Sequence, residues 1–543
     1  MQDVILEASM GMKCTDIAQA TLARLHKREY RLMFADCWKF SYIEDESIII
    51  NAMKECNREG EIYPYKDTIG LRLSGKVEGI DENLYKYHGI KTSYYNWKGK
   101  ELIDNTFQML NAGGCVGMWY DQFYMPWAKE MRKKAPLRYD GFFVLLEYKE
   151  YINSFLCIDI HGSRKIEVLP FEIFQQFVNL GEEHKIIVYE IFEERRIEYG
   201  LKENISIQLK RVGYGTGNSI CDKMRKFSRF VKENLDFEKE VQYSLLDIPE
   251  LSAPTHIDGV KRIRDVARMR TLYSITLEYY AEHNPLMKSL ASEFKIAASN
   301  WQNIVSVLVK ASYLKENKGL GETIAGLILK CADYEEYIME HMQSLLKTMN
   351  EDDGSIEEEE EVGKQQEFLY LKKFFNNKAF AKSINNVENA DIDGMGNFMI
   401  CEKKHKTQEN NLFSILETEK YDNVVCCGQN IKMDKTIESM SVIGTCDSGA
   451  YYGGIKIIYQ DDIVENKVIG FGEWRFDKCE LGERLVWSGE RVYFGMESKE
   501  EQGHIFENVL NGFRKCKIKE IVLPLNSHIH IFGITYVAKE EKV

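Results

Sequence analysis

The chain has 543 residues, too many for a single hydrophobic core, so its length predicts roughly two to four domains. Hydrophobic residues make up 44% of it and charged residues 29%, which is typical of a globular protein in water. The formal charge of -14 argues against nucleic acid as a partner, because binding to phosphates needs clustered Lys and Arg.

The sequence also indicates a compartment. No apolar run approaches the roughly 20 residues of a transmembrane helix, which argues against a membrane partner. The N-terminus lacks the basic and apolar regions of a signal peptide. The 13 cysteines are odd in number, scattered and not at zinc spacing, which favours reduced thiols. We therefore expect a cytoplasmic protein, and the abundant Lys, Ile and Glu are compatible with a bacterial source.

Cys14 opens the first predicted helix, which continues to Leu25 with apolar residues at helical spacing. A thiol at a helix N-terminus feels the positive end of the helix dipole, which favours the thiolate. Cys14 is therefore the candidate nucleophile.

Short apolar runs follow Gly113, notably Phe142 to Tyr148 and Phe155 to Ile160, and they predict buried strands. These strands are therefore expected to form the sheet half of a small α+β domain whose helical half lies upstream. An aromatic group in this region predicts either an acyl or amine pocket or ordinary core packing; its members are Trp119, Tyr120, Tyr124 and Trp127.

These residues resemble the family of butirosin biosynthesis protein H, N-terminal type. The matching segments are Cys14 with its helix, Met33 to Phe40, Asp121-x-x-Tyr-x-Pro-Trp127, Phe142 to Tyr148 and Cys157 to Asp159. The resemblance implies a papain-like domain over residues 1–178. It also implies transfer of an acyl group from a carrier-protein thioester to an amine through a Cys-His-Asp site, in which Asp159 orients the histidine.

One position departs from the family pattern. The resemblance places the histidine at the start of the strand containing Phe142, where this chain has Gly141. His161, two residues beyond Asp159, is the favoured substitute base, and His88 is the second choice. A thiol without a nearby base is a poor acyl acceptor, so a degenerate site remains an open alternative.

Residues 179–349 are predicted to be mainly helical, because apolar residues recur there every three or four positions. Residues 350–365 begin with a run of acidic residues and read as a linker.

Residues 366–543 contain regular short strands punctuated by Gly and Asn, which predict a β-sandwich. The pattern resembles galactose-binding-like jelly rolls through Asn376 to Lys378, Asp422 to Val424 and Gly470 to Trp474. Asp391 and Asp393 bracket a glycine turn, which predicts either a structural calcium ion or a plain Asx-rich turn.

The leading hypothesis is a carrier-protein-dependent acyl or peptidyl transferase of bacterial peptide or aminoglycoside natural-product biosynthesis. Its partners would be an acyl or peptidyl carrier protein with a phosphopantetheine arm and a small-molecule amine, and it would require no cofactor of its own. A catalytically degenerate papain-like scaffold and a cysteine peptidase are the alternatives, and the oligomeric state is open.

Overall fold

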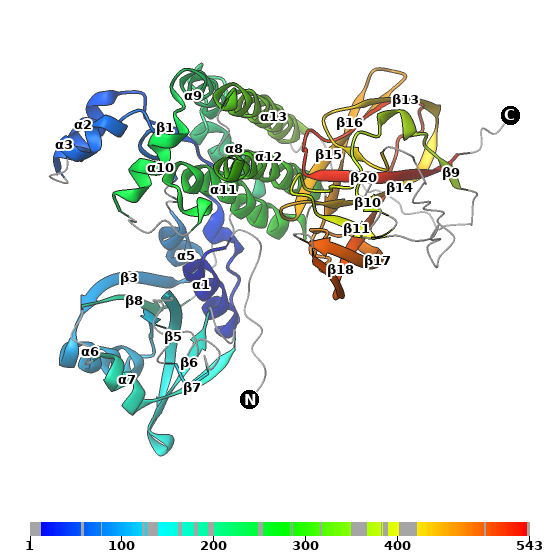
Figure 1. The fold of residues 1–543 in the computed structure, drawn as a ribbon. Coiled ribbons are helices and arrows are strands. Elements are labelled where there is room, and N and C mark those ends of the chain that lie inside the picture. Colours follow the sequence, from blue (N-terminus) through cyan, green and yellow to red (C-terminus); the bar gives the residue numbers. More distant parts are fainter. Residues whose placement is uncertain are drawn as a thin grey trace.

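The computed structural model describes residues 12–539 except 56–58, 76, 78, 122–124, 128–139, 161–164, 179–182, 194–199, 248–252, 283, 285, 315–317, 349–365, 382, 384–388, 401–420 and 494–495. The predicted acidic linker lies outside the described residues. Helices and several sheets coexist, so the mixed α+β class is confirmed (Figure 1). Among the described residues, no helix is both long and apolar enough to span a bilayer.

The N-terminal sheet is antiparallel and has six strands in the order β3-β8-β4-β5-β6-β7. These strands are β3 (Ile90–Trp97), β4 (Cys115–Asp121), β5 (Asp140–Lys149), β6 (Ser154–Asp159), β7 (Ile166–Pro170) and β8 (His184–Ile191). Strand β8 lies between β3 and β4 and pairs with both. The sheet is therefore completed by residues that follow the boundary predicted at residue 178.

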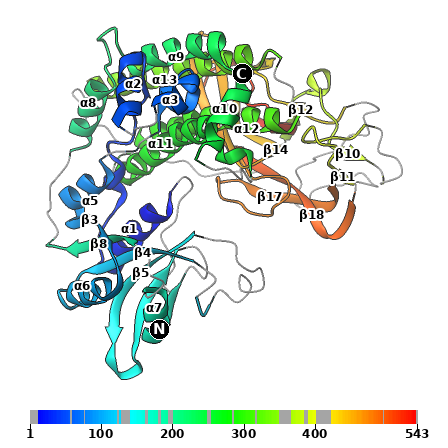
Figure 2. The same cartoon turned by 60° about the vertical axis from the view of Figure 1, so that its left-hand side comes forward.

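The two faces of this sheet are covered by different helices (Figure 2). Helix α1 (Cys14–Leu25) packs on one face, where Phe142 and Val144 of β5 point toward it. Helices α6 (Gly99–Asn111) and α7 (Phe171–Val178) pack on the other face, against Phe143 and Leu145. Neighbouring residues of a strand point to opposite faces of the sheet. A shift of one position along the strand therefore decides whether a side chain packs against α1 or against α6 and α7.

Long amphipathic helices form the middle of the chain, as predicted. They are α8 (Leu201–Arg211), α9 (Ile220–Asn234), α10 (Phe237–Leu245), α11 (Asp258–Ala281), α12 (Leu286–Leu314) and α13 (Leu320–Thr348). Shorter elements precede the sheet: η1 (Arg31–Phe34), β1 (Ser41–Tyr42), α2 (Glu46–Glu55), α3 (Glu59–Ile62), η2 (Tyr63–Tyr65), α4 (Ile69–Arg72), β2 (Leu73–Ser74) and α5 (Ile80–His88). One continuous apolar core joins α1, the face of the sheet below it and the long helices.

A buried ionic group lies at the centre of this shared core. The Glu335 carboxylate accepts hydrogen bonds from the indole N–H groups of Trp38 and Trp301, each at 2.8 Å. Arg270 donates to the same carboxylate through Nε at 2.9 Å and Nη2 at 2.8 Å. Because Trp38 precedes the sheet and Glu335 belongs to α13, this group fixes the N-terminal segment to the helices.

The C-terminal part contains two sheets that share one apolar core, which is compatible with the predicted sandwich. A four-stranded sheet has the order β13-β19-β15-β16, and an eight-stranded sheet has the order β10-β11-β17-β18-β14-β20-β12, with β9 paired to β20. The strands are β9 (Gln366–Phe368), β10 (Phe380–Ala381), β11 (Phe398–Ile400), β12 (Val424–Val425), β13 (Asn430–Lys435), β14 (Ile437–Cys446), β15 (Tyr451–Tyr459), β16 (Val464–Phe471), β17 (Arg484–Tyr493), β18 (Met496–Leu510), β19 (Ile518–Val522) and β20 (Ile529–Ala538).

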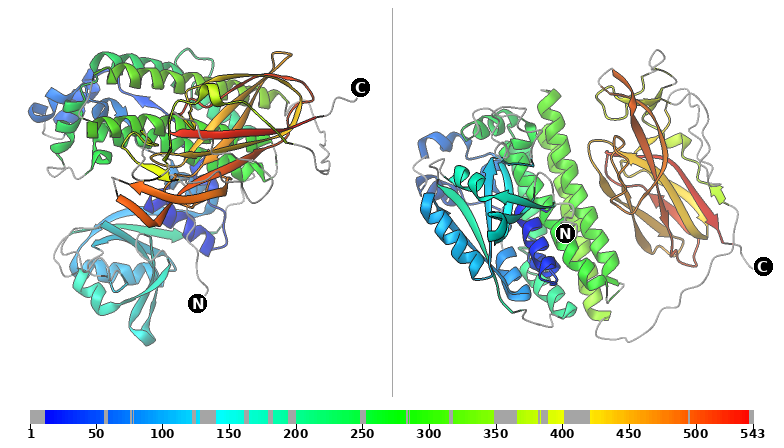
Figure 3. Two further views of the ribbon diagram at one scale, coloured as in Figure 1. Left: turned by 45° about the vertical axis from the view of Figure 1, so that its right-hand side comes forward. Right: turned by 90° about the horizontal axis from the view of Figure 1, so that it is seen from below.

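The C-terminal sheets lie beside the long helices (Figure 3), and α12 packs against β15 of this sandwich. The Ser306 hydroxyl lies 2.7 Å from the Tyr451 hydroxyl, and the Tyr452 backbone N–H donates to the Ser299 hydroxyl at 2.9 Å. These polar contacts hold β15 in one register along α12.

Candidate functional site

Cys14, the predicted nucleophile, begins α1 and is half-buried. Burial raises the pKa of the Cys14 thiol, and the Asp16 carboxylate raises it further. A backbone hydrogen bond and the Lys13 ammonium oppose these effects without reversing them. The surroundings therefore favour the neutral thiol, whereas position at a helix N-terminus alone predicts the thiolate.

The sheet below α1 offers apolar side chains where a papain-like site needs a base. The residues of β5 and β6 in the core under α1 are Phe142, Val144 and Ile158, followed by Ile160 just beyond the end of β6. None of these side chains can accept a proton. Phe142, Val144 and Ile158 therefore supply neither a catalytic acid nor a catalytic base to the face toward α1.

Asp159, the predicted orienting acid, belongs to the opposite face. It pairs across the strands with Phe143, whose side chain lies in the core under α6 and α7. Tyr120 donates its hydroxyl proton to Asp159 Oδ1 at 2.9 Å, and Trp127 donates its indole N–H to Oδ2 at 2.7 Å. The structure thus separates Asp159 from Cys14 and gives each carboxylate oxygen an aromatic partner.

Tyr120 also fills the space beside Gly141, the position at which the family resemblance requires a histidine. The two residues are direct cross-strand partners on β4 and β5. A Cβ atom added at Gly141 would overlap the Tyr120 ring and lie 2.8 Å from its hydroxyl oxygen. A histidine therefore fits at position 141 only if Tyr120 moves away, which breaks its hydrogen bond to Asp159.

The remaining predicted site residues do not converge on Cys14. His161, the favoured substitute base, and Tyr124 lie outside the described residues. His88 accepts a hydrogen bond at its carbonyl oxygen from Arg28 at 2.7 Å, just past the C-terminal end of α1. Cys14 is at the other end of this helix, about 18 Å away for 12 residues. Burial lowers the pKa of His88 to about 4, so its imidazole is neutral.

The predicted aromatic pocket is divided between the two faces. Tyr120 belongs to the core under α6 and α7, and Trp127 packs against that core. Trp119 lies on the Phe142 ring with 4.8 Å between centroids and is 36% exposed. Trp119 is therefore the one described member of this group on the side of α1.

An ion pair at the start of α1 is absent from the sequence prediction. Asp16 accepts the Lys13 backbone N–H at 2.8 Å and forms a buried salt bridge with Arg268 of α11. The Lys13 ammonium lies 2.9 Å from the carboxylate of Asp265, also on α11. These contacts hold the Cys14 end of α1 against a helix more than 200 residues later in the chain, and no local sequence pattern announces them.

The two carboxylates predicted as calcium ligands bind their own turn. Asp391 Oδ1 accepts the Gly394 backbone N–H at 2.7 Å. Asp393 accepts the Met395 N–H at 3.0 Å and the Asn397 side-chain amide at 2.8 Å. Where the chain is described, no three His, Cys, Asp or Glu residues are grouped so as to hold a metal ion. The donor set thus fits an Asx-rich turn better than a calcium site.

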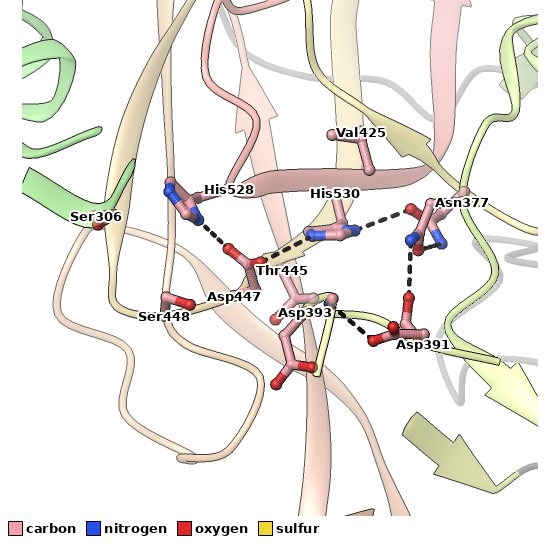
Figure 4. Close-up of polar contacts among 12 residues, drawn as sticks. Ser306, Asn377, Asp391, Asp393, Val425, Thr445, Asp447, Ser448, His528 and His530 are labelled. Atoms are coloured by element: carbon pink, nitrogen blue, oxygen red, sulfur yellow. Dashed lines mark hydrogen bonds and ion pairs between the residues drawn. The ribbon is translucent and has the colours of Figure 1, made fainter. Parts of the chain in front are cut away.

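A second polar cluster, which the sequence analysis missed, lies where the sandwich meets α12. Figure 4 shows Asp447 between the imidazoles of His528 and His530. Lys310 of α12 reaches the same carboxylate at 3.1 Å, and His530 Nδ1 lies 3.0 Å from Asn423 Oδ1. The His-x-His spacing before and within β20 was the available sequence signal, although nothing local linked it to Asp447.

No protein-family model matches this chain, and no curated protein matches it.

Proposed function

We propose that this chain is a non-catalytic binding protein, a papain-like scaffold that keeps the architecture of a carrier-protein-dependent acyltransferase and works in a natural-product biosynthetic complex. The observation that carries the proposal is the apolar surface of β5 and β6 below Cys14, formed by Phe142, Val144 and Ile158. A working site would present an imidazole to the Cys14 thiol.

The chemistry of acyl transfer supports the same conclusion. The thiolate must attack the thioester carbonyl, and a base must take the thiol proton and later the proton of the amine. Burial keeps Cys14 protonated, and both oxygens of Asp159 are occupied by Tyr120 and Trp127 on the other face of the sheet. The direction of the Cys14 pKa shift and the partners of Asp159 therefore both oppose activation of the thiol.

The partners follow from the family resemblance and are part of the proposal. A scaffold of this type binds an acyl or peptidyl carrier protein, or the enzyme that loads it, without forming a bond to the acyl group. Binding of the carrier protein should then be the same for the native protein and for Cys14→Ala.

The second candidate is the transferase itself, with Cys14 as nucleophile. It is favoured by the half-exposed position of this thiol at the first turn of α1. Its favoured base is His161, which lies outside the described residues. A low thiol pKa is the property that separates this candidate from the scaffold.

The pH dependence of alkylation tests the proposal. Cys516 is the matched control, because it is also a half-buried free thiol. We expect iodoacetamide to modify Cys14 no faster than Cys516 at neutral pH, with an inflection above that of free cysteine. An inflection below pH 7, with modification at least about tenfold faster than at Cys516, would favour the transferase.

A further inference from the structure

His530 is buried inside the sandwich, on the central strand β20. It pairs with Thr445 of β14 on one side and with Val425 of β12 on the other, and it is 1% exposed. Figure 4 shows its imidazole beside Asp447, which follows β14, and on the opposite side of the ring Nδ1 lies 3.0 Å from Asn423 Oδ1. The two ring nitrogens therefore face two different polar groups.

The orientation of Asn423 places a hydrogen on His530 Nδ1. Asn423 Nδ2 donates to Asn377 Oδ1 at 2.9 Å and to Asp422 Oδ1 at 2.8 Å. Asn377 is fixed in turn, because its Nδ2 donates to the backbone carbonyl of Asp391 at 2.8 Å. Asn423 therefore presents its amide oxygen to His530. This oxygen can only accept a hydrogen bond, so Nδ1 is the donor.

The second nitrogen of His530 faces a carboxylate. Nε2 lies 4.0 Å from Asp447 Oδ2 and has no hydrogen-bond partner among the described residues. In a neutral imidazole with its hydrogen on Nδ1, Nε2 carries a lone pair, which the carboxylate oxygen repels. A second proton turns this contact into an attraction between opposite charges. The geometry therefore favours the imidazolium form of His530.

The other partners of Asp447 are compatible with a charged His530. Lys310 of α12 lies 3.1 Å from Oδ2, and His528 contacts Oδ1 through its Nδ1. Nε2 of His528 has no partner within the described part of the chain, so a second proton on this ring would leave a buried N–H unpaired. The extra proton therefore belongs to His530. Burial opposes ionisation of Asp447, but the contacts with His528 and His530 hold the pKa of its carboxyl well below the usual value.

Further carboxyl groups come from two neighbouring segments. Asp391 and Asp393 belong to the turn between β10 and β11 (Figure 4), and Asp422 precedes β12. Burial raises the pKa of Asp393, and the charges of Asp391 and Asp447 raise it further. Burial also raises the pKa of Asp422, which the Lys378 ammonium opposes. The negative charge of these groups favours one more proton nearby.

We propose that His530 is a proton-operated latch: as an imidazolium it binds Asp447 and holds β20 against β14, and loss of the proton at higher pH releases this contact. An ordinary histidine of the unfolded chain releases its proton near pH 6.5. The folded sandwich retains this proton, so the stabilisation is complete below about pH 6.5 and is lost as the pH rises further. The inference is independent of the proposed function, because it involves neither Cys14 nor a carrier protein.

Nitrogen NMR of the full chain, labelled only in its 11 histidines, tests the protonation directly. The signal of His530 is the one that disappears in His530→Asn. At about pH 5.5 we expect a hydrogen on both ring nitrogens of His530, as the imidazolium form requires. A single N–H on this ring at that pH would overturn the proposal.

Hydrogen exchange of β14 and β20 tests the consequence for the sandwich. Protection, corrected for the intrinsic effect of pH, should fall about tenfold between about pH 5.5 and 8 in the native protein. His530→Asn keeps a donor toward Asn423 but cannot titrate, so its protection should be the same at both values. Protection that does not change with pH in the native protein, or that falls equally in His530→Asn, would refute the latch.

His504→Asn is the matched control for this substitution. His504 is also buried in the sandwich, on β18, and burial lowers its pKa, so it stays largely neutral over this pH range. The variant should keep the tenfold fall of the native protein. Loss of the pH dependence in His504→Asn as well would show that it does not arise at His530.

Discussion

Replacing Glu335, whose carboxylate lies at the centre of the shared core, tests how much the packing of the N-terminal segment on the long helices contributes to stability. Glu335 and Arg270 are both 0% exposed, and Glu335 also accepts the indole protons of Trp38 and Trp301. Glu335→Leu leaves the Arg270 cation buried and unpaired, which costs about 3–5 kcal/mol. The two indole N–H groups lose their acceptor as well, so the total should reach the upper end of this range.

A double-mutant cycle separates the interaction energy of the Glu335–Arg270 ion pair from the contribution of side-chain packing. Arg270→Met should cost about 3–5 kcal/mol by itself, for the same reason. In the double variant no charge remains buried, so the loss should fall short of the sum of the single losses by at least about 2 kcal/mol. Urea unfolding followed by tryptophan fluorescence measures these values, because Trp38 and Trp301 both lie in this core. Additive losses, or a loss below about 1 kcal/mol for Glu335→Leu, would contradict the reasoning.

Three further predictions follow from buried polar groups. Burial raises the pKa of Glu240 from 4.5 to about 8, so the folded protein retains a proton that the unfolded chain releases above pH 4.5. Stability should therefore fall by on the order of 4 kcal/mol from pH 4.5 to 8 in the native protein and less in Glu240→Gln, as measured by urea unfolding at each pH. Tyr120→Phe removes a donor from Asp159 and should lower the unfolding free energy by about 1–3 kcal/mol; an unchanged value would rule out a stabilising bond. Lys310→Met leaves Asp447 without its cation from α12, so hydrogen exchange of β15 should accelerate; identical exchange would show that this ion pair does not hold the sandwich.

Much of the fold could be predicted because its elements carry periodic apolar patterns. The mainly helical stretch over residues 179–349 and the strands around Phe142 and Phe155 match the observed elements closely. Contacts between segments far apart in the chain leave no periodic pattern in the sequence. The packing of α12 on β15 and the bonds from Trp38 to Glu335 depend on single side chains far apart in sequence.

The candidate site was harder to predict, because it depends on which face of the sheet each residue occupies. Cys14 was correctly placed at the start of a helix, but the sequence could not show that burial raises its pKa. Asp159 was expected near Cys14, and the strand register turns it to the other face. The glycine at position 141 was noticed as a missing histidine, but the Tyr120 ring above it became visible only through the pairing of β4 with β5.

The most direct test of the scaffold proposal is the mass of the intact protein after incubation with an acylated carrier protein, in parallel with Cys14→Ala. The proposal predicts that the protein binds the carrier, that binding survives in the variant, and that neither protein gains the acyl mass. An acyl group found on Cys14 in the native protein and missing from Cys14→Ala would contradict the proposal and establish the transferase.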